Sequence, residues 1–380
     1  MRVALLTNNL LPPREGIGRH LVELGRRLGR YGIEPLLVGR APEGTPAGLA
    51  EIEGVPARLI GWPGAPPIRH LRARATLQHW LDEGADGAEI LHVHSPLLPS
   101  LRTVLPVVLT VHSPMLTDNA AIRERGIEPL ARKVYARLFS RRLEQFWLDR
   151  ADVSLAVSAG VRDDLVARYR LRNGSPLVLP NGVDVAFFGA APSLPREPVV
   201  LFVGRLAWRK GLFRLLEAFA RLPPERARAL VLLGEGPLER DLRARAHRLG
   251  IAARVRFEGF VDRHGVRDWL ARSAVAVNPA DYESGPLTLL EAMAAGTPVV
   301  TTPTGLVPEL GSDPPVLVVE PTVEALAAGL QAVLARPDEA QARARRAAEL
   351  VRARFDWEKL ASRLAAIYLR IGRIAARRAA

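Results

Sequence analysis

The stretch Val199–Leu222 reads VVLFVGRLAWRKGLFRLLEAFARL and contains an apolar run, a glycine-bounded turn and an amphipathic segment. Val199–Val203 is apolar at every position, which is typical of a strand buried on both faces of a parallel sheet. After Gly211 the apolar residues recur at helical spacing. Strand, turn and helix in this order form a βα unit, and such units build parallel sheets covered by helices.

The same alternation of strand and helix patterns runs along the whole chain. Strands are predicted at Val3–Thr7, Pro35–Val38, Ile90–His94, Val107–His112, Val153–Ser158, Pro176–Leu179, Val199–Val203, Ala229–Leu233, Val255–Glu258, Ala274–Asn278, Pro298–Thr302 and Val316–Val319. Helices are predicted at 17–30, 119–150, 160–169, 211–222, 237–249, 264–273, 287–295, 322–335, 338–354 and 357–380. The predicted fold class is therefore α/β, with two Rossmann-like doubly wound domains facing a cleft.

A segment rich in proline and alanine, GAAPSLPREP at 189–198, separates two halves of similar size. The length of 380 residues also favours two domains. We therefore predict an N-terminal domain at 1–188, a C-terminal domain at 189–356, and a final helix at 357–380 that packs back on the N-terminal domain.

Composition narrows the function classes. The chain has no cysteine, which excludes disulfides and thiolate metal sites. The net charge is +13, and only Lys133, Lys210 and Lys359 of the 53 basic residues are lysines. This charge is spread through helices that also carry acids, which favours a composition bias or a heat-adapted surface over a nucleic-acid partner. No signal peptide or membrane-length apolar run is found, so we expect a cytoplasmic protein, at most peripheral on the inner face of the cell membrane.

Two segments could contact an anionic membrane surface. Residues 121–150 interleave basic and aromatic side chains, and the segment 361–380 carries five arginines and no acid. A solvated helix face is the simpler interpretation of both segments.

The turn after the strand Val199–Val203 holds two cations. Arg205 and Lys210 lie at the carboxyl end of that strand and just before a helix, where free backbone N–H groups and the helix dipole favour a diphosphate. A second turn, GEGP at 234–237, follows another strand, and Gly236 there permits close backbone approach to a ligand. Solvated loop residues are the alternative interpretation of these turns.

The stretch YESGPLTLLEAMAAGTPVV at 282–300 places Glu283 before a helix and Glu291 inside it. Pro286 suits the first turn of a helix. The N–H groups of Leu287 and Thr288 are then unpaired at the helix start and can hold phosphate oxygens. A carboxylate can accept two hydroxyl hydrogen bonds, which suits the diol of a ribose or sugar ring.

These motifs together resemble a known family. GRLAWRKG, GEGP and ESGPLTLLEAMAAGTPVV, with PPREGIGRHL at 12–21, HVHSP at 92–96, TVHSP at 110–114 and PNGVD at 180–184, resemble the retaining glycosyltransferase family 4. The resemblance covers nearly the whole chain. It implies the GT-B architecture, a nucleoside-diphosphate sugar as donor, no cofactor, and transfer of a hexosyl group to an acceptor hydroxyl with retention of anomeric configuration.

The resemblance also implies roles for individual residues. Arg205 and Lys210 are expected to bind the diphosphate and stabilise the leaving group, Glu283 to contact sugar hydroxyls, and His112 to lie over the transferred sugar. The remaining donor-binding positions are Gly16, Gly18, Gly204, Gly236, Val261, Gly285, Pro286, Leu287, Thr288 and Glu291, with Glu291 on the ribose. The acceptor is a saccharide, a lipid-linked saccharide or a small molecule.

The sequence departs from the family pattern at three places. Gly285-Pro286 stands where the family usually shows Phe-Gly, and Pro286 donates no N–H to a phosphate. Glu15 precedes Gly16 where a glycine is common, and Leu306 follows Gly305 where a second glycine is often seen. No Asp-x-Asp motif occurs, so we predict transfer without a metal.

The histidines allow further expectations. His92 and His94 lie on one predicted strand, and we expect them to point to opposite faces, one packed in the core and one reaching the cleft. No third ligand has the spacing of a zinc site, so no zinc site is predicted.

Three alternatives to a glycosyltransferase remain. An NAD-dependent dehydrogenase would need G-x-G-x-x-G directly after the first strand, but Gly16-Ile-Gly18 comes late and lacks the third glycine. A sugar-nucleotide epimerase or phosphorylase could share the fold. A basic nucleic-acid-binding protein is suggested by charge alone.

Overall fold

The computed structural model describes residues 1–8, 10–12, 16–62, 68–95, 98–120, 134, 139–190 and 195–379. The described chain divides into two compact units. Unit 1 contains the chain up to Asn181 together with the C-terminal helix that begins at Trp357, and unit 2 contains Gly182–Asp356.

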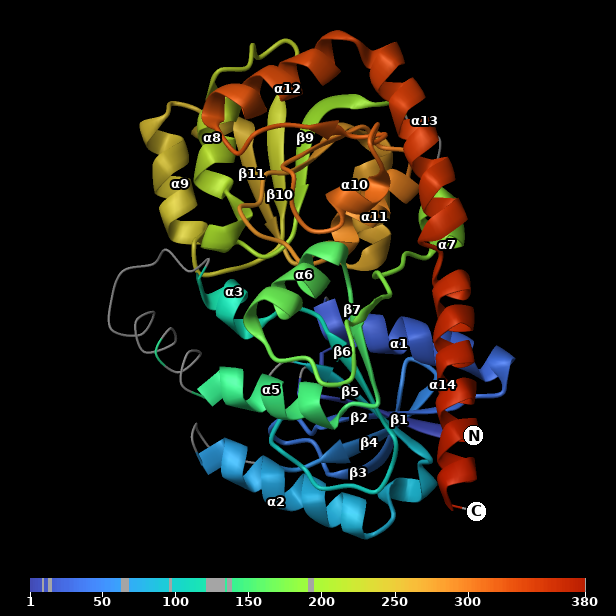
Figure 1. The fold of residues 1–380 in the computed structure, drawn as a ribbon. Coiled ribbons are helices and arrows are strands. Elements are labelled where there is room, and N and C mark those ends of the chain that lie inside the picture. The colour runs from blue at the N-terminus through green and yellow to red at the C-terminus, as the bar shows by residue number, and fades with distance from the viewer. Residues whose placement is uncertain are drawn as a thin grey trace. The chain divides into compact units, whose positions relative to one another are not determined.

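Unit 1 is built on a sheet with the strand order β3-β4-β2-β1-β5-β6-β7-β8. Figure 1 labels its strands β1 to β7. The strands are β1 (Arg2–Thr7), β2 (Glu34–Arg40), β3 (Gly48–Ile52), β4 (Val55–Ile60), β5 (Ile90–Ser95), β6 (Val107–Val111), β7 (Val153–Ala156) and β8 (Leu177–Val178). All neighbours pair in parallel except β3 and β4, which form an antiparallel hairpin at the edge. The central strands carry side chains buried on both faces, as parallel strands between helical layers must.

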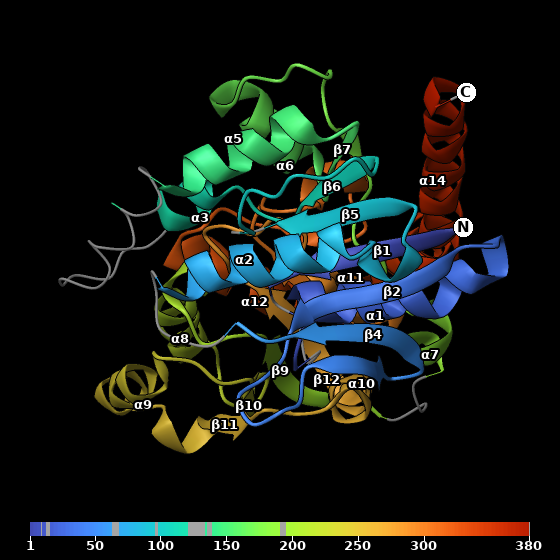
Figure 2. The ribbon, with the colours of Figure 1, turned by 90° about the horizontal axis from the view of Figure 1, so that it is seen from below.

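Helices cover both faces of this sheet (Figure 2). They are α1 (Gly16–Leu28), α2 (Ile68–Asp82), α3 (Met115–Ala120), α5 (Arg141–Arg150), α6 (Ala159–Arg168) and α14 (Trp357–Ala379). On one face α2, α5 and α6 bury Leu77, Trp147 and Leu165 against the sheet. On the other face α1 and α14 pack against each other and against the opposite side chains of β1 and β5.

Unit 2 is a fully parallel six-stranded sheet with the order β11-β10-β9-β12-β13-β14. Its strands are β9 (Glu197–Val203), β10 (Ala229–Leu233), β11 (Val255–Gly259), β12 (Ser273–Asn278), β13 (Val299–Thr301) and β14 (Leu317–Val318). Its helices are α7 (Val185–Gly189), α8 (Leu212–Ala220), α9 (Glu239–Arg248), α10 (Arg263–Arg272), α11 (Leu287–Ala294), α12 (Val323–Ala335) and α13 (Pro337–Arg354). One apolar core lies under α8, α9 and α12 and another under α7, α10, α11 and α13, so the sheet is doubly wound.

The strand orders locate where ligands can bind. In unit 2 the chain leaves β9 toward β10 and later returns to place β12 on the other side of β9. In unit 1 the same reversal occurs between β1 and β5. Crevices at the carboxyl ends of strands flanking such a reversal are the usual ligand sites of doubly wound sheets.

Within the described residues, β3, β4, α2 and α7 are elements that the pattern did not predict, and α3 begins four residues before the helix expected at 119–150. The edge strand β3 is mostly exposed, so it lacks the apolar run of a buried strand. The helix expected at 119–150 is present at its C-terminal end as α5, and most of the rest lies outside the described residues. No helix in the described part of the chain is long and apolar enough to cross a membrane.

Candidate functional site

The loop after β9 and the loop after β10 meet backbone to backbone. Gly204, with φ of +146°, donates its N–H to the carbonyl of Leu233 at 2.9 Å, and the N–H of Leu206 bonds to the carbonyl of Glu235 at 2.9 Å. A Cβ at Gly234 would approach the carbonyl carbon of Gly204 to 2.9 Å, and one at Gly236 would approach the nitrogen of Leu206 to 2.7 Å. Glycine is therefore required in the GEGP turn because the neighbouring backbone fills the side-chain space.

Lys210, which is partly buried, and Glu283, which is buried, form an ion pair in unit 2 between Nζ and Oε1. Lys210 comes from the short turn after β9, and Glu283 comes from the loop that follows β12. Their side chains are 12% and 7% exposed. Because β9 and β12 are adjacent, the strand reversal brings together two residues that lie far apart in the sequence.

A second set of bonds fastens the same two loops. The guanidinium of Arg214 donates to the carbonyl of Pro279 at 2.7 Å and to Oδ1 of Asp281 at 2.8 Å. The N–H of Asp281 bonds to the carbonyl of Arg209 at 2.8 Å. Neither Arg214 nor Asp281 was singled out from the sequence, because nothing in their local pattern distinguishes them from other charged residues in an arginine-rich chain.

Arg205 differs from Lys210. Its side chain is exposed, and no hydrogen bond or ion pair joins it to another residue in the described ranges. The predicted cation pair is therefore asymmetric: Lys210 is already neutralised by Glu283, whereas the charge of Arg205 is uncompensated and available to an anionic ligand.

The start of α11 lies beside this ion pair. Gly285 and Pro286 are buried, and Leu287 and Thr288 are the first two residues of the helix, where backbone N–H groups lack helical acceptors. Pro286 provides no side-chain cap. Glu291, half-buried, lies one turn further along the helix.

Gly305 supports this turn, which the sequence did not reveal. Its φ is +63°, and a Cβ there would lie 2.7 Å from Cδ of Pro286 and 3.3 Å from Cβ of Glu283. Only glycine combines this backbone conformation with that close approach. Val261, half-buried, lies between β11 and α10, where a Cβ on Gly265 would clash with its side chain.

In unit 1, Gly16 begins α1 with φ of +64° and is exposed, while Gly18 is buried one half-turn later. The residues just before them, including Glu15, lie outside the described part of the chain. The structure therefore places these two glycines at the N-terminus of α1, next to the strand reversal of unit 1.

A cluster of buried histidines lies on the face of unit 1 that α1 and α14 cover. His94 and His112 approach to 3.0 Å through Nδ1 and Nε2, and His20 of α1 contacts Oδ1 of Asn181 through Nδ1 at 3.0 Å. His92 pairs with Thr110 at 2.8 Å and with the hydroxyl of Tyr368.

The expectation that His92 and His94 point to opposite faces is wrong. Their ring centroids are 4.0 Å apart, and both rings lie on the side of β5 that faces α14. Residues two apart in a strand share a face because side chains alternate at every position.

Burial keeps the histidine cluster neutral near pH 7. Loss of solvation lowers the pKa of His20 to about 4, although its bond to Asn181 acts in the opposite direction. Burial first, and neighbouring histidines second, lower the pKa values of His92, His94 and His112 well below the usual range.

His20, His94 and His112 each bring one ring nitrogen to within 4.8 Å of the others. The absence of a third ligand was inferred from spacing alone, and the third imidazole comes from α1, far away in the sequence. A metal bound by all three rings would displace the short contact between His94 and His112.

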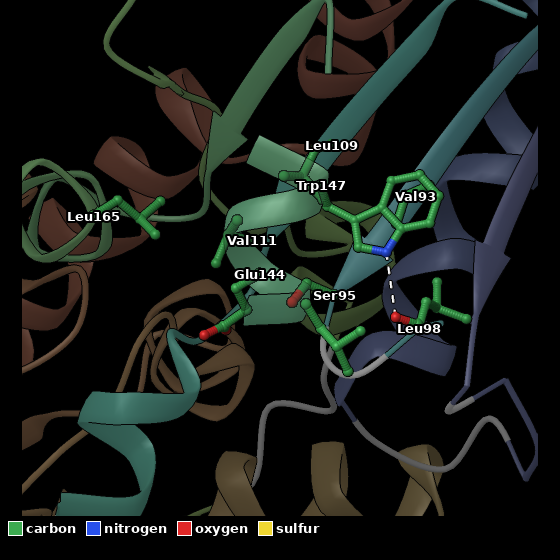
Figure 3. A pocket seen from close by; sticks show the side chains of 9 residues that line it. Val93, Ser95, Leu98, Leu109, Val111, Glu144, Trp147 and Leu165 are labelled. Atoms are coloured by element: carbon green, nitrogen blue, oxygen red, sulfur yellow. Dashed lines mark hydrogen bonds between the residues drawn. The ribbon is translucent and has the colours of Figure 1, made fainter. Parts of the chain in front are cut away.

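The second feature of unit 1 is a mainly apolar crevice beneath α5 (Figure 3). Trp147 lines it and bonds to the carbonyl of Leu98 at 3.3 Å. Glu144 also lines it, accepting the N–H of Met115 at 2.9 Å and the hydroxyl of Tyr169. Burial raises the pKa of Glu144 to about 7 against the opposing effect of these two hydrogen bonds. Glu144 was not predicted as notable, because its segment reads as an ordinary charged helix.

Comparison with known proteins identifies the family. The model of group 1 glycosyl transferases matches residues 188–351, and the model of Glycosyltransferase Family 4 matches residues 14–187. The phosphatidyl-myo-inositol mannosyltransferase of Mycobacterium tuberculosis is 30% identical, over 97% of this chain and 96% of its own. The glycogen synthase of the same organism is 28% identical over 93% and 91%.

Solved structures share the fold. Sucrose-phosphate synthase from Thermosynechococcus elongatus has a TM-score of 0.79 at 22% identity, covering 97% of this chain and 98% of its own. HepE from Anabaena, in complex with UDP-glucose, has a TM-score of 0.74 at 18% identity, covering 97% and 99%. The predicted α/β class with two Rossmann-like units of the GT-B type is confirmed. The chain therefore belongs to the group 1 glycosyltransferases, and its N-terminal half matches Glycosyltransferase Family 4. The protein is a glycosyltransferase.

Proposed function

We propose that this enzyme transfers a hexosyl group from a nucleoside-diphosphate sugar to an acceptor hydroxyl, with retention of configuration and without a metal ion. The observation that carries the proposal is the set of groups at the carboxyl ends of β9 and β12. An uncompensated arginine, Arg205, a lysine–glutamate pair and the open start of α11 occur together there. A diphosphate attached to a polyhydroxylated sugar suits such a mixture of cations, N–H groups and carboxylates.

The charges suggest how the leaving group is stabilised. Negative charge develops on the diphosphate as the glycosidic bond to the donor breaks, and fixed cations at that position lower the barrier. Arg205 supplies a full charge. Lys210 supplies charge when Glu283 turns its carboxylate oxygens to sugar hydroxyls. These two side chains can perform the charge stabilisation that a divalent metal performs in other transferases.

The other assignments follow the family resemblance. Glu291 holds the ribose, Leu287 and Thr288 present N–H groups to phosphate, and Gly204, Gly236, Gly285, Pro286 and Val261 border the nucleotide. Pro286 shapes the turn without donating a hydrogen bond. In unit 1, Gly16, Gly18 and His112 contact the transferred sugar. The epimerase and phosphorylase alternatives are disfavoured, since the similar proteins named above include a mannosyltransferase and synthases.

Thermal unfolding with UDP, GDP, ADP and NAD tests the donor site. A ligand at ~100 times its dissociation constant adds roughly 2.7 kcal/mol to the free energy of unfolding. We expect one nucleoside diphosphate to stabilise the wild type and the control Glu349→Ala, whose side chain is exposed on α13. The same nucleotide should fail to stabilise Glu291→Ala. Stabilisation by NAD alone would contradict the proposal.

We also propose that the exposed face of α14 binds an anionic membrane surface. Leu369 and Ile374 are 40% and 43% exposed, and Arg370, Arg373 and Arg377 are exposed between and beyond them. Apolar and basic side chains on one helix face suit the interface of an anionic bilayer. Cosedimentation with phosphatidylserine vesicles at low salt, lost in Arg370→Glu/Arg373→Glu, is the expected result. No cosedimentation of the wild type would refute this surface.

A further inference from the structure

The contact between His94 and His112 contains a single proton. Nδ1 of His94 lies 3.0 Å from Nε2 of His112, and a hydrogen bond between two neutral imidazoles needs one N–H and one lone pair. Burial keeps both rings neutral, so the proton belongs either to His94 or to His112. The two arrangements give His112 opposite tautomers.

The other nitrogen of His94 decides between them. Nε2 of His94 is buried and has no hydrogen-bond partner among the described residues. If His112 donated to His94, the proton of neutral His94 would lie on this Nε2 as a buried, unsatisfied donor, at a cost of about 1–3 kcal/mol. If His94 donates from Nδ1, its Nε2 is only a bare lone pair, and buried unpaired N–H groups are the rarer defect.

The consequence falls on His112. As the acceptor at Nε2, neutral His112 carries its proton on Nδ1. Nδ1 of His112 has no partner among the residues that the structure describes, but unlike Nε2 of His94 it is accessible to solvent, so an N–H there is not a buried, unsatisfied donor. The ring therefore presents an N–H donor at the end of β6 that is left for a ligand.

Neighbouring rings hold this orientation. The ring of His20 stands at 90° to that of His112 with centroids 4.8 Å apart, and at 82° to that of Trp357 with centroids 5.1 Å apart. His20 is itself fixed through Nδ1 by Asn181. These contacts fix the ring of His20, and His112 is held between that perpendicular ring and the ring of His94, whose centroid lies 5.3 Å away.

We propose that His94 is a positioning residue that sets His112 in the Nδ1–H tautomer, so that His112 donates a hydrogen bond to an oxygen of the transferred sugar. The tautomer follows from the cluster itself. Only the identity of the acceptor oxygen rests on the proposed function.

Nitrogen-15 spectra of histidine-labelled wild-type enzyme test the tautomer directly. The His112 ring is assigned from the signals missing in His112→Gln. We expect a protonated Nδ1 and a bare Nε2 for His112 near pH 7.5. Protonation at Nε2 of His112 would overturn the proposal, and this measurement requires no variant of His94 that folds.

Two substitutions of His94 separate positioning from packing. The amide nitrogen of asparagine lies near the place of Nδ1 in histidine, and that of glutamine near the place of Nε2. His94→Asn therefore keeps a donor toward His112, whereas His94→Gln removes it. We expect His94→Asn to retain the His112 tautomer and most of kcat, and His94→Gln to lose both, with kcat falling on the order of tenfold.

The outcomes distinguish this inference from the proposed function. Equal kcat values in His94→Asn and His94→Gln, with the tautomer changed in one alone, would overturn the positioning role. Zn²⁺ stabilisation of the wild type that His94→Asn abolishes would mean that the rings ligate a metal, which also overturns it. If no nucleotide stabilises the enzyme while the Nδ1–H tautomer is observed, the donor proposal fails and the tautomer assignment stands.

Discussion

Lys210 and Glu283 are joined through Nζ and Oε1 with side chains 12% and 7% exposed. The pair ties the turn after β9 to the loop after β12, at the strand reversal of unit 2. Two opposite charges so little exposed stabilise each other, but either one alone would be left without its counter-charge in a site of low dielectric. The stability of these two loops therefore depends on both side chains together.

Removal of one partner should destabilise the enzyme more than removal of both. We expect Lys210→Met to lower the free energy of unfolding by about 3–5 kcal/mol, because Glu283 then remains buried and unpaired. Lys210→Met/Glu283→Leu should recover most of this loss. Urea denaturation of the two single variants and the double variant measures the coupling, and strictly additive losses would contradict the buried-pair account.

Arg205 should affect turnover without affecting stability. Its exposed side chain has no partner in the described ranges, so Arg205→Met should change the free energy of unfolding by less than about 0.5 kcal/mol. Its kcat should fall by roughly 10²–10³ if the guanidinium stabilises the departing diphosphate. Arg248→Met, at an exposed position on α9, is the matched control and should keep full activity. Unchanged kcat in Arg205→Met would remove Arg205 from the site.

Gly236→Ala should disturb the contact between the loops after β9 and β10. Its Cβ would lie 2.7 Å from the nitrogen of Leu206, so the loop after β9 must move. We expect a loss of about 1–3 kcal/mol in the free energy of unfolding, together with weaker nucleotide stabilisation. Gly29→Ala is the control, because its Cβ meets nothing within 4 Å and should be neutral or slightly stabilising. Equal behaviour of the two variants would contradict the close backbone approach.

The parts of the fold predictable from sequence were those that depend on local periodicity. Runs such as Val199–Val203 and Ala229–Leu233 are apolar on both faces, and they form β9 and β10 as expected. The edge strand β3 was missed because it is mostly exposed, whereas α2 was missed although Ala73, Leu77 and Trp80 are buried at helical spacing, because these three apolar residues form a narrow stripe in a largely polar segment. Their place is fixed by tertiary pairing, which no local window contains.

The contacts within the candidate site could likewise not be predicted from local sequence patterns. Lys210 and Glu283 were both selected from their motifs, but their pairing depends on the adjacency of β9 and β12. The cluster of His20, His94 and His112 depends on α1 packing over β5 and β6. Chemical type and position at strand ends can be read from a sequence, whereas partners from distant elements depend on strand order.

The buried histidines should make the enzyme sensitive to acid. His20 has its pKa lowered from 6.5 to about 4, and those of His92, His94 and His112 are lowered in the same direction. At a pH between the lowered pKa and 6.5, the unfolded chain binds more protons than the folded chain. Stability is therefore lost as the pH falls below about 6.5. Each such group contributes up to ~1.4 kcal/mol per pH unit. Urea midpoints from pH 7.5 to 5 should fall steeply in the wild type and less steeply in His20→Gln. An unaltered slope in that variant would contradict the burial of a neutral His20.

Glu144 should make the enzyme less stable as the pH rises, which is opposite to the effect of the buried histidines. Burial raises its pKa from 4.5 to about 7, so the folded state binds the extra proton and stability falls as pH rises between these values. From the difference in pKa, the free energy of unfolding above pH 7 is roughly 3 kcal/mol lower than it is below pH 4.5. Glu144→Gln resembles the protonated form, since its oxygen can accept the N–H of Met115 and its amide can donate to the hydroxyl of Tyr169. We therefore expect Glu144→Gln to match the wild type in urea denaturation at pH 5 and to exceed its stability at pH 8. A variant less stable than the wild type at pH 8 would mean that Glu144 is buried as a well-compensated carboxylate.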